Sequence, residues 1–189
     1  MADQPYRKSL RLAGDDYRGG AYFVTVVTQR RLHLFGDVAD GALVPNQLGL
    51  AVRDEWLRTA SVRPGTDIDA FVVMPNHLHG IVWLPSDGEG GAGGSQPVDR
   101  LGRPLVSRTL GALVRGFKAA STRRVNIERD TPGSPLWQRN YHEQVIRNRA
   151  HLLQVRRYIF ENPLRWASDP ENLDAIPDAW ERSFWRQIP

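Results

Sequence analysis

The chain contains no cysteine, only two lysines and no long run of apolar residues. Without cysteine, disulfides, thiolate metal sites and cysteine nucleophiles are excluded, so any metal must be held by nitrogen and oxygen ligands. No apolar stretch approaches the roughly 20 residues that span a bilayer, and segment 1–11 lacks the apolar centre of a signal peptide. We therefore expect a cytoplasmic protein with no membrane partner.

The basic residues are almost all arginine. Arginine accounts for 23 of the 25 lysines and arginines, which stand against 21 acidic residues for a net charge of +4. The planar guanidinium suits bidentate contacts with phosphate, which favours nucleic acid as a partner. A GC-rich coding sequence would produce the same bias, so the bias supports nucleic-acid binding without establishing it.

The 189 residues are enough for one domain with a sizeable core. Apolar periodicity and β-branched content predict four strands and three helices. In chain order these are strand 20–28, helix 46–60, strands 68–74 and 77–84, helix 106–125, strand 137–146 and helix 149–161. This order predicts an α+β fold with the ferredoxin-like split arrangement, an antiparallel sheet with helices on one face, plus an extra C-terminal helix. The other face would be free for ligands.

Two segments stand apart from this predicted domain, which spans residues 1–166. Residues 86–103 include six glycines and few apolar residues, which is typical of a mobile surface loop. The tail 167–189 carries large apolar side chains, among them Ile176, Trp180 and Trp185. We therefore expect the tail to dock on the domain.

The most informative motif is a pair of histidines separated by one leucine. Alternate side chains on a strand share a face, so His77 and His79 can ligate one divalent ion while Leu78 faces a core. The alternative is that one histidine is satisfied within the sheet and the other is exposed.

Tyr158 and Asn162 are four residues apart on the last predicted helix and so share a face. A divalent cation beside a tyrosine suits phosphodiester chemistry, because the cation offsets the charge of the phosphate oxygens while the phenol attacks phosphorus. Asn162 would supply an oxygen ligand. Alternatively, Tyr158 is a packing aromatic, and Asn162 followed by Pro163 simply ends the helix.

Further polar residues are candidates for contacts with DNA or with the metal. His142 and Glu143 alternate on a predicted strand, so only one of them can face the site, and a surface pair is the alternative. The basic residues that we expect to contact a DNA backbone are Lys118, Arg123, Arg124, Arg139, Arg156 and Arg157.

These motifs resemble the HUH single-tyrosine transposases, and especially the REP-associated tyrosine transposases of bacteria. The similarity extends from about Arg7 to Trp166, with its segments in family order. The matching segments are Arg7–Leu12, Gly20–Thr25, Met74–His79, Phe117-Lys118, Trp137–Glu143 and Arg157–Leu164.

The resemblance implies that His77 and His79 are metal ligands and that Tyr158 is the nucleophile. Asn162 would be the third ligand, where insertion-sequence relatives carry glutamine. The resemblance also implies Mg²⁺ or Mn²⁺ as cofactor, and single-stranded or hairpin DNA from palindromic repeats as substrate. A 5′-phosphotyrosine intermediate would form on that DNA. A monomer is favoured over a homodimer, as in the REP-associated branch.

We therefore expect a metal-dependent single-strand endonuclease and strand transferase, that is, a transposase. One alternative is a non-catalytic single-stranded nucleic-acid-binding or autorepressor module, which predicts that Tyr158→Phe leaves every activity intact. A hydrolytic metal phosphodiesterase that uses water predicts turnover without a protein–DNA adduct. A pure packing domain leaves the coincidence of the histidine pair with the tyrosine and asparagine unexplained.

Overall fold

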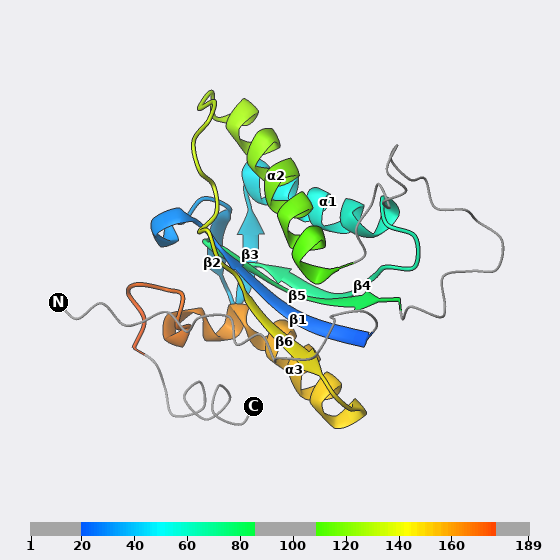
Figure 1. Cartoon of the computed structure of the whole chain (residues 1–189). Coiled ribbons are helices and arrows are strands. Elements are labelled where there is room, and N and C mark those ends of the chain that lie inside the picture. The colour runs from blue at the N-terminus through cyan, green and yellow to red at the C-terminus, as the bar shows by residue number, and fades with distance from the viewer. Residues whose placement is uncertain (1–19, 86–108, 177–189) are drawn as a thin grey trace, which may run out of the picture.

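A four-stranded antiparallel sheet lies at the centre of the molecule, in the order β4-β5-β1-β6 (Figure 1). The computed structural model describes residues 20–85 and 109–176. Its sheet strands are β1 (Gly20–Val27), β4 (Asp67–Val73), β5 (His77–Leu84) and β6 (His142–Ile146). The helices are α1 (Gln47–Ser61), α2 (Leu110–Glu128) and α3 (Arg149–Glu161), with 3-10 turns η1 (Gln29–Arg31) and η2 (Pro163–Ser168).

This architecture confirms the predicted α+β fold. Helix α1 connects β1 to β4, α2 connects β5 to β6, and the first strand lies between the third and fourth strands of the sheet. That arrangement is the ferredoxin-like split pattern, and α3 is the extra C-terminal helix. Within the part of the chain that is described, no helix is long and apolar enough to cross a membrane.

Some predicted boundaries are wrong. Regular pairing of the fourth sheet strand begins at His142, whereas Trp137 makes a single bridge to Thr28. Helix α2 begins after its cap residue Thr109 and continues to Glu128, three residues beyond the predicted end. The predicted loop 86–103 lies outside the described residues.

A short hairpin of β2 (Gly36–Ala39) and β3 (Ala42–Pro45) was not predicted. Its two turn residues, Asp40 and Gly41, have φ of 51° and 72°. An Asp-Gly pair with both φ angles positive is characteristic of a two-residue hairpin turn. The dipeptide was therefore the sequence signal for this hairpin, although the flanking strands are too short to show clear alternation.

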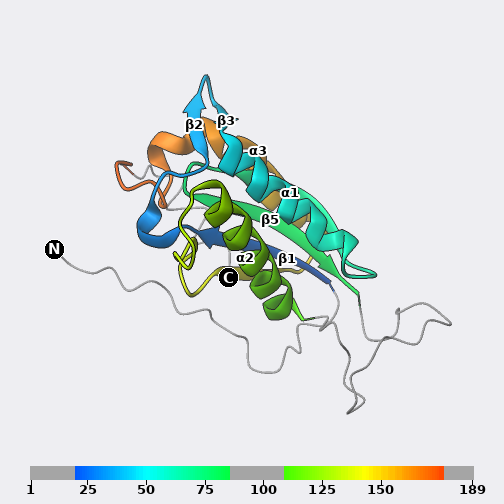
Figure 2. The ribbon, with the colours of Figure 1, turned by 90° about the horizontal axis from the view of Figure 1, so that it is seen from above.

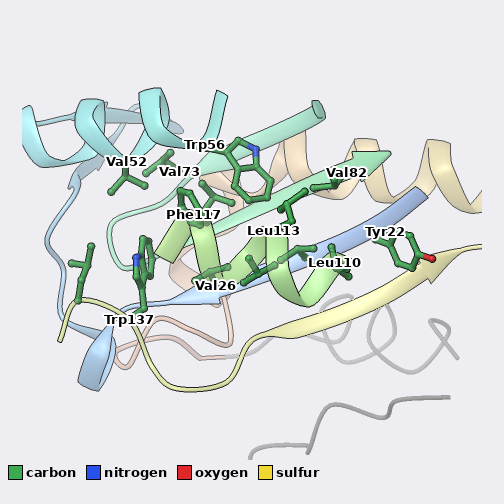
Figure 3. Packing of buried hydrophobic residues seen from close by; sticks show 14 of the residues in the cluster. Tyr22, Val26, Val52, Trp56, Val73, Val82, Leu110, Leu113, Phe117 and Trp137 are labelled. Atoms are coloured by element: carbon green, nitrogen blue, oxygen red, sulfur yellow. The ribbon is translucent and has the colours of Figure 1, made fainter. Parts of the chain in front are cut away.

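The two faces of the sheet are covered by different helices. Helices α1 and α2 lie side by side over one face (Figure 2), where Trp56 and Phe117 pack on Val26 and Val82 (Figure 3). Helix α3 covers the opposite face (Figure 1). The expectation of a ligand-accessible second face is therefore wrong. Alternate residues of the central strands are apolar on both faces, which is typical of a strand buried on both sides.

Helix α3 packs on the sheet through Leu152, Val155 and Ile159, at the spacing of one helical face. Leu153 and Phe160 are apolar too, but their side chains are 53% and 82% exposed. They lie one residue beyond the buried positions, so the helix rotation carries them to the solvent side. The buried face of α3 continues through polar positions that belong to the candidate site.

Candidate metal and tyrosine site

His77 and His79 lie side by side on β5, on the face of the sheet that α3 covers. Their partners on the neighbouring strand β1 are Val27 and Thr25. Both imidazoles are fully buried, and their ring centroids are 4.4 Å apart. Leu78, between them, belongs to the core on the opposite face. The i, i+2 spacing has therefore placed the two rings together, as predicted.

Each histidine has one ring nitrogen held by a neighbouring side chain. Nδ1 of His79 lies 2.7 Å from Oγ1 of Thr25, and Nδ1 of His77 lies 2.8 Å from Oδ1 of Asn76. The Asn76 amide nitrogen donates to two backbone carbonyls, which turns its oxygen toward His77 as an acceptor. Asn76 Oδ1 can only accept, so Nδ1–H of His77 donates to it and Nε2 of His77 carries the lone pair that a metal requires. Nε2 of His79 carries one in the tautomer in which Nδ1–H donates to the Thr25 hydroxyl.

The environment keeps His79 neutral. Burial, together with the nearby His77 and His142 imidazoles, holds the pKa of His79 well below its usual 6.5. A neutral imidazole is the form that binds a metal. His142 also faces this side of the sheet, where it packs edge-on against Phe23, while Glu143 alternates to the other face.

Asp169, directly after η2, adds a buried carboxylate to the histidine pair. Its Oδ2 lies 3.8 Å from Nε2 of His77, and the ligand atoms of His77, His79 and Asp169 are all within 4.8 Å of one another. The sequence interpretation missed Asp169, because this residue lies in the predicted tail and approaches the histidines only through docking of that segment.

Asn162, the predicted third ligand, is fully buried next to Asp169. Its Nδ2 donates to Asp169 Oδ2 at 2.9 Å. Its Oδ1 and the Nε2 atom of His77 are buried without a hydrogen-bond partner among the described residues. Buried polar atoms without partners are costly, and a divalent cation held by imidazoles and oxygens would satisfy them. The residues therefore fit such an ion.

Tyr158 reaches the same place from α3. Its side chain is fully buried, and its hydroxyl lies 3.3 Å from Nε2 of His79. The ring packs edge-on against Phe23, with centroids 5.9 Å apart. We call His77, His79, Tyr158, Asn162 and Asp169 the metal–tyrosine cluster.

The segment after α3 closes over the cluster. Trp166 of η2 lies 6.1 Å from His77, ring centroid to ring centroid. Nε of Arg31 donates to the Glu171 carboxylate at 2.8 Å, and the Glu171 carbonyl accepts from Asn76 at 2.8 Å. The first residues of the predicted tail are thus in contact with the site, whereas residues 177–189 lie outside the described chain.

Four of the six predicted DNA-contacting residues have acceptors within the protein. Lys118 Nζ donates to the carbonyls of Gln138, Arg139 and Asn140 at 2.8–3.3 Å, and burial lowers the pKa of this amine to about 8. The other three are paired with carboxylates: Arg124 with Asp54 and Glu55, Arg156 with Asp69, and Arg157 with Glu161. Arg123 and Arg139 are exposed, and neither guanidinium has a partner among the described residues.

The Arg156–Asp69 pair joins α3 to the edge strand β4. Nε and Nη2 of Arg156 donate to the two Asp69 oxygens at 3.0 and 2.7 Å, and Trp83 Nε1 donates to the same carboxylate at 2.9 Å. Burial opposes ionisation of Asp69, but the hydrogen bonds from Arg156 and Trp83 lower its pKa overall. The contact lies two residues from Tyr158 and holds its helix against the sheet.

Comparisons with known proteins agree with this architecture. No family model matches the sequence. An uncharacterized protein of Haemophilus influenzae (strain ATCC 51907 / DSM 11121 / KW20 / Rd) is 34% identical over 174 residues, covering 89% of this chain and 94% of the relative. A solved REP-associated tyrosine transposase bound to a REP hairpin matches with a TM-score of 0.55 and 20% identity, over 100% of this chain and 88% of that one. The chain therefore belongs to the same family as the Haemophilus influenzae protein, and its fold is similar to that of the solved REP-associated tyrosine transposase.

Proposed function

We propose that the protein is a metal-dependent single-tyrosine transposase that nicks and rejoins single-stranded or hairpin DNA. The observation that carries the proposal is the convergence of His77, His79 and Asp169 with the Tyr158 hydroxyl in one buried cluster. The solved structure of similar fold is a tyrosine transposase bound to a REP hairpin, which supports DNA as the substrate class.

The cation would be held by Nε2 of both histidines and by an oxygen of Asp169 or Asn162. When bound, it supplies positive charge that offsets the charge on a non-bridging phosphate oxygen. A set of two imidazoles and one carboxylate favours Mn²⁺ over Mg²⁺, because Mg²⁺ prefers oxygen ligands.

Tyr158 acts as the nucleophile in this proposal. Its phenol oxygen forms a bond to phosphorus as the bond from phosphorus to the 3′ oxygen breaks, leaving a 5′-phosphotyrosine and a free 3′ hydroxyl. The phenol gives up its proton, and the leaving 3′ oxygen gains one. Attack by a second 3′ hydroxyl reverses the step and joins strands, because the covalent intermediate retains the energy of the broken ester.

The deciding experiment is a denaturing-gel assay for a protein–DNA adduct. Single-stranded oligonucleotides that cover palindromes flanking the gene are incubated with the protein and Mn²⁺, Mg²⁺ or EDTA. We expect a metal-dependent covalent band that disappears in Tyr158→Phe and in His77→Ala. Tyr158→Phe is the matched variant, since it keeps the ring that packs on Phe23 and removes only the hydroxyl.

The same assay separates the rival functions. Cleavage without an adduct, retained in Tyr158→Phe, would identify water as the nucleophile and remove Tyr158 from the chemistry. DNA binding without cleavage, for both metals and the whole oligonucleotide set, would favour the non-catalytic binding module.

A further inference from the structure

A groove of about 870 Å³ lies between the C-terminal half of α2 and the segment 130–139. We call it the α2 groove. Its position is distinct from the metal–tyrosine cluster, which lies on the α3 side of the sheet. Trp137, one of its lining residues, belongs to the core under α1 and α2 (Figure 3).

The lining of the α2 groove combines apolar surface with positive charge. Ile127 is 70% exposed, and Pro132 and Pro135 are exposed on the opposite wall. Arg123 and Arg139 contribute a guanidinium from each side. Asp130 is the one acidic residue among the described residues that line the groove. Such a surface suits an anion that also carries apolar faces.

The two arginines of the groove are available for a ligand. The other four basic residues that the sequence marked for DNA binding are already held by carboxylates or carbonyls. Arg123 and Arg139 are exposed without a partner in the described part of the chain. Of the six basic residues predicted to contact DNA, the two without a partner among the described residues therefore both line this groove.

One end of the groove is anchored beside the histidine pair. Trp137 forms a bridge with Thr28, and the backbone N–H of Gln138 donates to the carbonyl of Val27 at 2.9 Å. Val27 is the β1 partner of His77. A polymer bound at the metal–tyrosine cluster can therefore extend past this end of the sheet toward the groove.

From these observations we propose that the α2 groove binds an unpaired stretch of the DNA substrate next to the strand held at the metal–tyrosine cluster. Unpaired nucleotides present apolar base faces to the groove walls and phosphates to Arg123 and Arg139. A duplex keeps its base faces stacked inside the helix and cannot place one against Ile127. The inference rests on the proposed function for its substrate class.

The test measures binding and leaves catalysis out. The Tyr158→Phe protein in EDTA is titrated with a fluorescein-labelled twelve-nucleotide oligothymidine and, in parallel, with a blunt DNA hairpin that has no unpaired flank. Combining Arg123→Ala with Arg139→Ala should weaken oligothymidine binding at least tenfold and lower the salt slope by about 0.7 for each phosphate that the variant no longer neutralises. Arg115→Ala, an exposed arginine on α2 outside the groove, should change it less than twofold.

A second pair of variants adds the same single negative charge at two neighbouring positions, so the two variants have equal net charge. Ala119 lines the α2 groove, whereas its exposed neighbour Ala120 lines a separate pocket between α1 and α2. Ala119→Glu should reduce oligothymidine affinity about tenfold more than Ala120→Glu does. Equal losses in both would overturn the proposal and reduce the effect to overall charge.

The outcome is independent of the proposed chemistry. A loss confined to the blunt hairpin would assign the groove to duplex DNA, and no loss with either probe would exclude it from DNA binding; both contradict the proposal. An adduct assay that fails while oligothymidine binding depends on the groove would contradict the transposase function and leave the groove as a DNA-binding surface.

Discussion

At the scale of single residues, Asp169 gives the metal–tyrosine cluster the negative charge that its imidazoles lack. Its carboxylate is fully buried, with one oxygen 2.7 Å from the Glu171 amide and the other 2.9 Å from the Asn162 amide nitrogen. An imidazole that ligates a metal is neutral, so among these three side chains the carboxylate supplies the negative charge that attracts a divalent cation. The carboxylate is therefore expected to contribute more to cation affinity than the neutral amide of Asn162 does.

This expectation can be tested by titrating Mn²⁺ into the DNA-free protein and measuring heat or electron paramagnetic resonance. Asp169→Asn should weaken Mn²⁺ binding by about 10- to 100-fold, the range seen when a group that orients or supplies a ligand is removed. Asn162→Ala should weaken it less, and Asp174→Asn, an exposed carboxylate nearby, should leave it unchanged. A larger loss in Asn162→Ala than in Asp169→Asn would restore Asn162 as the main oxygen ligand, as the resemblance implies.

The sequence was sufficient for residues whose geometry is local. His77 and His79 share a face because they are two apart on a strand, and Tyr158 and Asn162 share one because they are four apart on a helix. Asp169 could not be found in this way, because its approach to His77 depends on how the chain turns after α3. For the same reason, the sequence could not show that Arg156 is held by a carboxylate of β4.

At the scale of elements, α3 is held to the sheet by an apolar stripe and by the Arg156–Asp69 ion pair. Removal of this ion pair should let the helix shift on β4, and misplacement of a nucleophile by about 1 Å can reduce a rate by about 100-fold. We therefore predict that Arg156→Met lowers the rate of adduct formation at least tenfold while DNA affinity changes less than twofold. Single-turnover kinetics and fluorescence anisotropy measure the two quantities.

Arg157→Met is the matched control for this prediction. Arg157 is the next residue, carries the same charge and pairs with Glu161 of its own helix at 2.7 Å. Its replacement removes the same charge without freeing α3 from β4, so the adduct rate should stay within twofold of the parent. If Arg156→Met weakens DNA binding and lowers its salt slope with an unchanged rate at saturating DNA, Arg156 contacts DNA directly.

Elements were predictable from the sequence where hydrophobic periodicity was strong. Helices α1 and α3 begin and end within two residues of the predicted limits, because their caps Asn46 and Asn148 and the following apolar spacing are local signals. The layer in which α3 lies was not predictable. A strand that is apolar on both faces indicates that both faces of the sheet are buried, but no local feature of the sequence shows which helix packs on the second face.

At the scale of the whole molecule, the metal–tyrosine cluster is enclosed between the sheet, α3 and the segment that follows it. Tyr158, both histidines and Asp169 have almost no exposed surface. A scissile phosphate can therefore reach Tyr158 only when part of this cover moves. The Arg31–Glu171 ion pair is the contact to test, because it joins the segment after η2 to the 3-10 turn η1 that follows β1.

We predict that Glu171→Gln speeds the approach of DNA to the cluster. The pair is only partly exposed, so its removal should cost the closed state about 1 kcal/mol, and the open population should rise about fivefold. Under single-turnover conditions at low DNA concentration, the rate of adduct formation should then rise three- to fivefold, with an unchanged maximal amount of adduct. The Asn76 hydrogen bond is kept in this variant, because Asn76 donates to the backbone carbonyl of Glu171.

A matched control is Glu161→Gln, which breaks ion pairs with Arg157 and Arg165 on the outer side of the same region. That variant should leave the rate unchanged, since neither of those pairs crosses from the segment to the sheet. A slower rate in Glu171→Gln would show that Glu171 serves to align Asn76 and His77 for catalysis. In that case removal of the Arg31–Glu171 ion pair would not be the step that opens the cover.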